Sequence, residues 1–250
     1  RIKILYGRAQ ILIKPVQIFA VGGGGFTHPE DNYPHDAILE DHLLALAGPI
    51  ANVRIGYIGH ASNDNPAKID MFYKRFNGCA SMTTLPLEAN LAEARFFLNN
   101  LDILYVGGGA TENMLAHWQK IGICKILIEA ARSGLILSGV SAGAICWFSE
   151  LLLGSAKDGY SLHKGLGLLA GSACPHFSNE PPRKRAFEQQ IANGRLAAGL
   201  AIDDGVAIHI CDGVVTNIIS ARGASANAYF VRSNHSEVEV KPMDLGHQVI

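Results

Sequence analysis

Short apolar runs alternate with helical patterns through the first half of the chain. Residues 16–21, 53–58, 101–106 and 135–138 are typical of buried strands, and glycines or a polar loop follow each of them. Between these runs, apolar spacing predicts helices over 36–47, 68–76, 89–99, 112–120 and 123–132, with a weaker strand over 80–85. This alternation predicts a three-layer α/β fold, with a mostly parallel sheet covered by helices on both faces.

The second half of the chain has a less regular pattern. Residues 150–164 show no clear periodicity, and 183–193 are expected to form a helix. Short β-like runs at 206–210, 214–218 and 228–231 predict antiparallel strands at an edge of the sheet. The 250 residues contain no internal repeat or linker, and 48% of them are hydrophobic. We therefore expect residues 1–250 to form a single α/β domain with a large core.

The composition argues against several classes of function. A formal net charge of -1 does not favour capture of nucleic acid or of an anionic membrane. No apolar run approaches the roughly 18 to 20 residues of a membrane span. The five cysteines are scattered without a Cys-x-x-Cys pair, which favours reduced thiols in a cytoplasmic protein: Cys79, Cys124, Cys146, Cys174 and Cys211. No metal or other cofactor is implied, and we expect a monomer or a homodimer.

A serine flanked by glycines follows one of the predicted strands. Gly139-Val-Ser-Ala-Gly143 places Ser141 where an apolar strand gives way to a second apolar segment, which is expected to be helical. A strand-to-helix turn of this kind presents a serine hydroxyl as a nucleophile, and the glycines keep side chains away from the substrate. The alternative is a tight structural turn. The glycine run at 22–25 lacks the Gly-Lys-Ser/Thr ending of a phosphate-binding loop.

A nucleophilic serine needs a base and an acid that orients the base. His176 lies 35 residues after Ser141, beside a proline and before a polar loop. It is preferred over the other candidate bases, His60, His163 and His209. Asp158 lies between Ser141 and His176 and is the preferred acid. The alternative acids are Glu150, Asp203 and Asp204.

An acyl-transfer site also needs hydrogen-bond donors where negative charge develops on the carbonyl oxygen. The amide of Ala142, directly after the serine, is one natural donor. Gly108 or Gly109 can provide the second donor, because a glycine loop leaves its amides exposed. These three residues are the predicted oxyanion hole.

Four ordered motifs together resemble the dipeptidase E family of serine peptidases. They are Val106-Gly-Gly-Gly-Ala-Thr-Glu-Asn-Met-Leu115, Gly139-Val-Ser-Ala-Gly-Ala-Ile-Cys-Trp-Phe148, Cys174-Pro-His-Phe177 and Ala201-Ile-Asp-Asp-Gly-Val-Ala207. This family is related to the cyanophycinases, and its fold is similar to that of class I glutamine amidotransferases. The resemblance extends from the glycines at 22–25 to about Phe230.

The resemblance implies hydrolysis of short peptides by a Ser-His-acid triad. Ser141 and His176 fall on the motif positions, and Gly107-Gly-Gly109 matches the oxyanion loop of the family. Members that prefer an N-terminal aspartate use an arginine after the histidine loop, and Arg183 is the nearest candidate. Where the family usually has Asn-Thr after the glycines, this chain has Ala110-Thr111. This departure concerns substrate preference.

The leading hypothesis is a serine exopeptidase that cleaves dipeptides or short peptides, with a possible preference for N-terminal Asp. A cyanophycinase-like hydrolase of β-aspartyl peptides is the first alternative. A catalytically silent binding protein on the same fold is the second. Amidotransferase chemistry is disfavoured, because it uses a cysteine where this chain has Ser141.

Overall fold

The computed structural model describes residues 14–27, 36–234 and 237–249. Its larger sheet has seven strands in the order β11-β10-β1-β5-β4-β2-β3. The strands are β1 (Gln17–Val21), β2 (Arg54–Ile58), β3 (Ser81–Thr84), β4 (Ile103–Val106), β5 (Ile136–Val140), β10 (Val206–Cys211) and β11 (Val214–Ser220). The first five of these are parallel to one another, whereas β10 and β11 form an antiparallel edge.

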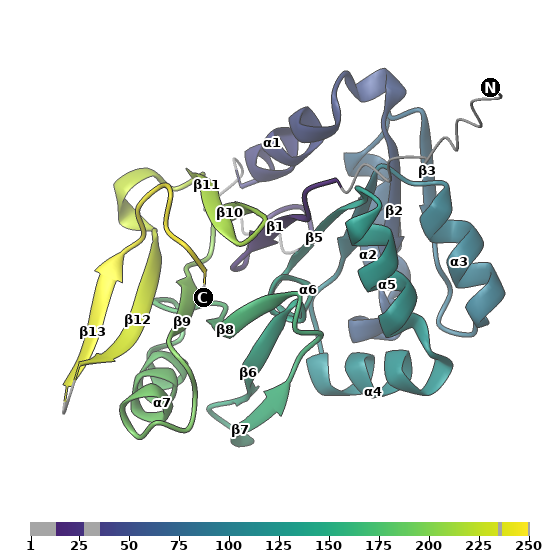
Figure 1. Ribbon diagram of the computed structural model, residues 1–250. Helices are drawn as coiled ribbons and strands as arrows, with labels where there is room; N and C mark the ends of the chain where they lie inside the picture. Colours follow the sequence, from purple (N-terminus) through teal and green to yellow (C-terminus); the bar gives the residue numbers. More distant parts are fainter. Residues whose placement is uncertain (1–13, 28–35, 235–236, 250) are drawn as a thin grey trace, which may run out of the picture.

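Helices cover both faces of the larger sheet (Figure 1). They are α1 (Ile38–Ala47), α2 (Pro66–Arg75), α3 (Leu91–Asn99), α4 (Thr111–Ile121) and α5 (Ile123–Arg132). Alternate residues of β1 belong to two different apolar clusters, because successive side chains of a strand point to opposite faces. Phe19 packs in the cluster that includes residues of α1 and α2, and Ile18 in the one that includes residues of α3, α4 and α5. The predicted three-layer arrangement is therefore confirmed.

A second sheet of six strands lies beside the first, in the order β13-β12-β9-β8-β6-β7 (Figure 1). Its strands are β6 (Phe148–Ser155), β7 (Gly159–Lys164), β8 (Leu169–Cys174), β9 (Gly199–Ile202), β12 (Ala228–Asn234) and β13 (Glu237–Pro242). The central strands β6, β8 and β9 are parallel, and β7, β12 and β13 are antiparallel to their neighbours. Helix α7 (Pro181–Ala192) packs on this sheet through Phe187 and Ile191.

The second sheet differs from the sequence-based expectation in two places. Residues 150–164 form the hairpin β6–β7 rather than an irregular segment. The expected antiparallel edge is correct for β10 and β11, but β12 pairs with β9 in the other sheet. Strand β7 is largely polar and only partly buried, so its apolar pattern is weak. A short run cannot indicate which of two sheets it joins, because its partner is distant in the sequence.

Short helices complete the structure. Helix α6 (Ala142–Ile145) follows the serine turn and has only four residues, because the chain enters β6 at Phe148. The described residues also form three 3-10 turns: η1 (Ile50–Asn52), η2 (His60–Ser62) and η3 (Gly223–Ser225). Within the described ranges, no helix combines the length and apolar character needed to cross a membrane.

Candidate active site

Ser141 lies on a sharp turn between β5, which ends at Val140, and α6, which begins at Ala142. Its backbone has φ 53° and ψ -109°, a conformation that a residue with a side chain rarely adopts. A Cβ on Gly139 or Gly143 would overlap the carbonyl oxygen of Val106. Glycine is therefore required at both positions for the turn to pack against β4. The predicted strand, turn and helix are all present, although the helix is short.

A continuous chain of hydrogen bonds connects a serine, a histidine and an aspartate. Nε2 of His176 lies 2.8 Å from Oγ of Ser141, and Nδ1 of His176 lies 2.5 Å from Oδ1 of Asp204. The side chains of His176 and Asp204 are 20% and 12% exposed, so this pair is largely shielded from water. A carboxylate on Nδ1 fixes the ring so that Nε2 can accept the proton of the serine hydroxyl. The geometry is therefore that of a Ser-His-Asp triad.

The acid next to the histidine is Asp204, and this corrects the sequence-based choice of Asp158. Strands β8 and β9 are parallel neighbours, with Cys174 paired to Ala201. The residues after their carboxyl ends therefore meet, which brings Asp204 to His176. Asp158 instead lies in the β6–β7 turn, where it accepts a hydrogen bond of 2.9 Å from Ser155. The position of Asp158 between Ser141 and His176 in the sequence does not place it next to His176 in the structure.

The other candidate acids have different partners. Glu150 lies on β6, where its carboxylate contacts Lys164 at 2.9 Å and accepts a hydrogen bond from the Ala197 amide at 2.8 Å. Asp203 is buried and accepts hydrogen bonds from the amides of Ser178 at 2.8 Å and Asn227 at 3.0 Å. It therefore joins the loop after β8 to the loop after β9.

A second side chain joins the same two loops. The Oδ1 atom of Asn179 accepts a hydrogen bond of 3.0 Å from the amide of Asp204. His176, three residues earlier, has a positive φ of 54°. Strained backbone of this kind persists only where its surroundings hold it in place. Asp203 and Asn179 therefore fix the relative positions of His176 and Asp204.

The other three candidate histidines lie outside the triad. His60 is buried, contacts the Leu85 carbonyl at 3.0 Å and accepts a hydrogen bond from the Trp118 indole at 3.0 Å; burial lowers its pKa. His209 contacts the side chains of Gln17 and Thr216. His163 contacts Ser161 at 3.0 Å.

The glycine run after β1 packs directly against the triad. A Cβ on Gly23 would collide with Oδ1 of Asp204 and with Nδ1 of His176. The amide of Gly205 donates a hydrogen bond of 2.9 Å to the carbonyl of Gly23, so this loop is also tied to the loop of Asp204. Glycine here allows the backbone to approach the His-Asp pair closely. The neighbours of Gly23 in the structure are therefore two residues of the triad.

Ser141 opens into a cavity of about 490 Å³. The cavity is lined by the start of α4, the Ser141 turn, the β6–β7 hairpin and Arg183. Glu112 and Asp158 are the acidic residues of this lining. The guanidinium of Arg183 donates to Glu180 at 2.8 Å and to the carbonyl of Gly154 at 2.9 Å. The volume lies within the range of small-molecule sites.

The predicted oxyanion donors lie in the same part of the structure. Gly109 and Ala142 line the cavity together with Ser141, whereas Gly108 does not. The amide of Ala110 donates to the carbonyl of Ala61 at 2.7 Å and is therefore occupied. Of the three predicted donors, Gly109 and Ala142 therefore share the lining of the cavity with Ser141.

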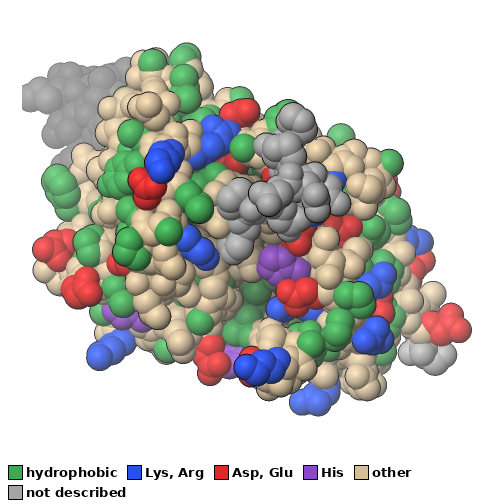
Figure 2. All heavy atoms as spheres, turned by 180° about the vertical axis from the view of Figure 1, so that it is seen from behind, with side chains coloured by type: hydrophobic (Ala, Val, Ile, Leu, Met, Phe, Trp, Pro, Cys, Tyr) green, Lys and Arg blue, Asp and Glu red, His purple; other side chains and the backbone are tan. Residues whose placement is uncertain are grey.

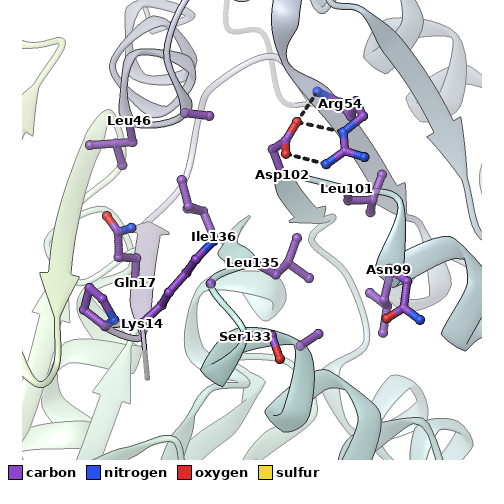
Figure 3. Close-up of a pocket in the computed structure, with 15 residues that line it drawn as sticks. Lys14, Gln17, Leu46, Arg54, Asn99, Leu101, Asp102, Ser133, Leu135 and Ile136 are labelled. Carbon is purple, nitrogen blue, oxygen red and sulfur yellow. Dashed lines mark hydrogen bonds and ion pairs between the residues drawn. The ribbon is translucent and has the colours of Figure 1, made fainter. Parts of the chain in front are cut away.

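A second cavity, of about 450 Å³, lies at the opposite end of the larger sheet. Figure 3 shows Gln17 and Ile136, the first residues of β1 and β5, along its wall, and the ion pair between Arg54 and Asp102 above them. Ligands of open α/β sheets bind outside the carboxyl ends of the strands. This cavity lies at the amino ends and is therefore not part of the Ser141 site.

Cys146 is not placed to replace Ser141 as a nucleophile. Its side chain is fully buried, and its thiol contacts the carbonyl of Gly143 at 3.6 Å. Burial raises the pKa of this thiol well above its usual value, so the reactive thiolate is disfavoured. Within the described residues, no group of three His, Cys, Asp or Glu side chains is arranged to hold a metal ion.

A parallel α/β sheet with a serine on a strand-to-helix turn, backed by histidine and aspartate, is the arrangement of hydrolases with a serine nucleophile. Comparison with known sequences gives the family. The sequence model of peptidase family S51 matches residues 18–218. The chain belongs to this family, and the dipeptidase E resemblance is thereby confirmed.

Individual relatives agree with this assignment. An uncharacterized peptidase, YgaJ, of Bacillus subtilis (strain 168) is 36% identical over 232 residues, which span 91% of this chain and 96% of that protein. Two crystal structures have a similar fold. A putative peptidase E protein from Listeria monocytogenes EGD-e has a TM-score of 0.58 at 19% identity, covering 92% of this chain and 100% of that chain. A peptidase from an acI-B1 Actinobacterium has a TM-score of 0.65 at 16% identity, covering 94% of this chain and 97% of that chain.

Proposed function

We propose that the protein is a serine exopeptidase that hydrolyses dipeptides or other short peptides. The observation that carries the proposal is the hydrogen-bonded chain Ser141–His176–Asp204 at the wall of a cavity, in a member of peptidase family S51. Each of the three side chains has the partner that acyl transfer requires.

The reaction follows from these contacts. Oγ of Ser141 attacks the peptide carbonyl carbon while its proton passes to Nε2 of His176. The amides of Gly109 and Ala142 hold the oxyanion of the tetrahedral intermediate. The C–N bond then breaks, and His176 gives its proton to the leaving amine. Water, deprotonated by His176, hydrolyses the acyl-enzyme and releases Ser141.

The charges of the protein fit a small substrate. On the face shown in Figure 2, basic and acidic side chains are interspersed, without a broad patch of one sign. Within the cavity, Glu112 and Asp158 can attract the ammonium group of a short peptide, and Arg183 can attract a carboxylate. A cavity that carries both signs of charge suits a zwitterionic peptide.

Replacing Ser141 with alanine tests the proposal. We expect Ser141→Ala to abolish hydrolysis of a panel of dipeptides and tripeptides, because no other described nucleophile lies beside His176. Amine release is measured with the wild-type protein and with the variant, and circular dichroism verifies that both are folded. Turnover that persists in Ser141→Ala would show that a different group attacks the peptide. A wild-type protein that binds peptides without cleaving them would favour the silent binding protein.

A cyanophycinase-like activity on β-aspartyl-arginine is the second candidate. The carboxylates of Glu112 and Asp158 favour it, because they can pair with a substrate guanidinium. Comparing the kcat/KM of β-Asp-Arg with those of α-Asp-Leu and Ala-Leu separates the two candidates.

Arg183 is the proposed contact for an N-terminal aspartate. We expect Arg183→Gln to raise the KM for Asp-Leu about tenfold and the KM for Ala-Leu by less than about threefold, because only Asp-Leu carries the extra carboxylate. The two KM values are measured in parallel with wild-type and variant protein. Equal changes for both substrates would assign Arg183 to the structure of the cavity wall, where it already bonds Glu180 and Gly154.

A further inference from the structure

A lysine outside the cavity contacts the loop that carries the Gly109 amide. Nζ of Lys68, on α2, donates a hydrogen bond of 3.1 Å to the carbonyl of Gly108. The side chain of Lys68 is partly buried, and burial lowers its pKa. Lys68 and Gly108 are both absent from the lining of the cavity, whereas Gly109 and Ser141 belong to it.

Because the peptide unit is planar, the contact to the Gly108 carbonyl also fixes the direction of the Gly109 N–H. In a trans peptide, the C=O of Gly108 and the N–H of Gly109 point in opposite directions. Lys68 holds the Gly108 carbonyl, so the Gly109 N–H points away from Lys68; Gly109 lines the cavity and Lys68 does not. No hydrogen bond from this amide to another described residue is found, so it is available to a ligand.

This peptide unit needs an external restraint. It lies between two glycines, and Gly109 has φ 150°, a conformation suited to glycine alone. The next amide, that of Ala110, is already tied to the carbonyl of Ala61. Lys68 supplies the contact that fixes the Gly108 carbonyl, and a bond from an ammonium group is stronger than one from a neutral donor.

Lys68 is itself held by the start of its helix. Asn65 caps α2 by accepting a hydrogen bond of 2.9 Å from the amide of Ala67, and Pro66 occupies the first helical position. Lys68 therefore stands in a well-defined first turn. Lys74 on the same helix is exposed and pairs with Asp70 at the surface.

We propose that Lys68 is a positioning residue that aligns the Gly109 amide as an oxyanion donor, an inference that rests on the proposed function. Lys68 acts on the transition state only through the Gly108–Gly109 peptide and does not touch the substrate. Removing it releases the peptide plane, so that the amide donor is no longer preorganised.

The test compares Lys68→Met, Lys68→Arg and the control Lys74→Met. Direct loss of an oxyanion donor lowers kcat by about 100-fold to 1,000-fold. We expect Lys68→Met, which disorients the donor, to lower kcat by about 10-fold to 100-fold with a KM within about threefold. Lys68→Arg retains a cationic donor and should keep at least about a third of the wild-type kcat. Lys74→Met should match the wild type.

A transition-state analogue provides the readout that a purely structural role would not move. The affinity of a dipeptide aldehyde, which forms a tetrahedral adduct on serine, should fall in Lys68→Met by the same factor as kcat. Thermal unfolding shows whether each variant is folded, and Lys68→Gln replaces Lys68→Met if the latter is not. Unchanged kcat and aldehyde affinity, with wild-type turnover intact, would overturn this inference alone. Absence of wild-type peptide turnover and of wild-type reaction with the aldehyde would overturn the proposed function and this inference with it.

Discussion

Two residues of the triad have left-handed backbone conformations. Ser141 has φ 53° and His176 has φ 54°, and each such conformation costs on the order of 1 to 3 kcal/mol. The surrounding loops offset this cost through the packing of Gly139 and Gly143 on β4, and through the bonds made by Asp203. The strain places the hydroxyl of Ser141 and the ring of His176 in direct contact.

The acid of the triad gives a prediction at the scale of single residues. We expect Asp204→Asn to lower kcat by about 10,000-fold, because an amide at this position stabilises the wrong tautomer of His176. Asp158→Asn, the matched control, should change kcat by less than about tenfold, since Asp158 contacts Ser155 and not His176. Steady-state kinetics on one dipeptide measure both. A larger loss of kcat in Asp158→Asn than in Asp204→Asn would restore Asp158 as the acid.

At the same scale, the sequence predicted some site residues and not others. Ser141 was identifiable because its glycines and flanking apolar runs are contiguous in the chain. Asp204 was one of four open candidates, because its proximity to His176 depends on the pairing of β8 with β9. Lys68 was not singled out, because it contacts a backbone carbonyl and leaves no motif in the sequence.

At the scale of elements, helix α1 brings a buried carboxylate close to the glycine loop. Glu40 accepts hydrogen bonds from the amide of Phe26 and the hydroxyl of Tyr105, and its side chain is fully buried. Burial raises its pKa from 4.5 to about 7, although the nearby Arg75 acts in the opposite direction. A carboxylate this deep in the fold therefore makes stability depend on pH.

The direction of this dependence follows from the raised pKa. The folded state holds the Glu40 proton more tightly than the unfolded state does. The contribution of this proton to the free energy of unfolding is therefore fully present below pH 4.5. It is lost as the pH rises through about 7 and amounts to roughly 3 kcal/mol. We expect Glu40→Gln to remove this part of the pH dependence of the free energy of unfolding and to be more stable than the wild type at pH 8. Urea unfolding at pH 5 and pH 8 measures the effect, and equal slopes in both proteins would refute it.

The elements themselves were predicted unevenly. Those of the larger sheet were recognisable because buried parallel strands give continuous apolar runs and the helices between them are amphipathic. The hairpin β6–β7 was missed because β7 is mostly polar and partly exposed. Its turn contains Asp158, which lines the same cavity as Ser141.

At the scale of the whole molecule, residues from both sheets form the site. The larger sheet provides Ser141 after β5 and the glycine loop after β4. The smaller sheet provides His176 after β8 and Asp204 after β9. The second sheet was not predicted from the sequence, because β7 is mostly polar and the pairings of β9 with β8 and β12 join segments that are distant along the chain. Its presence explains why the acid follows the histidine in sequence.

In the proposed mechanism, Ser141 is a nucleophile that His176 activates. Reaction with a fluorophosphonate, followed by mass spectrometry of the digested protein, tests this role, because such probes bond covalently to activated serines. We predict one adduct, on the peptide that contains Ser141, and loss of labelling in His176→Ala. A folded wild-type protein that stays unlabelled at Ser141, or labelling of Ser141 that is unaffected by His176→Ala, would contradict this role of the two residues.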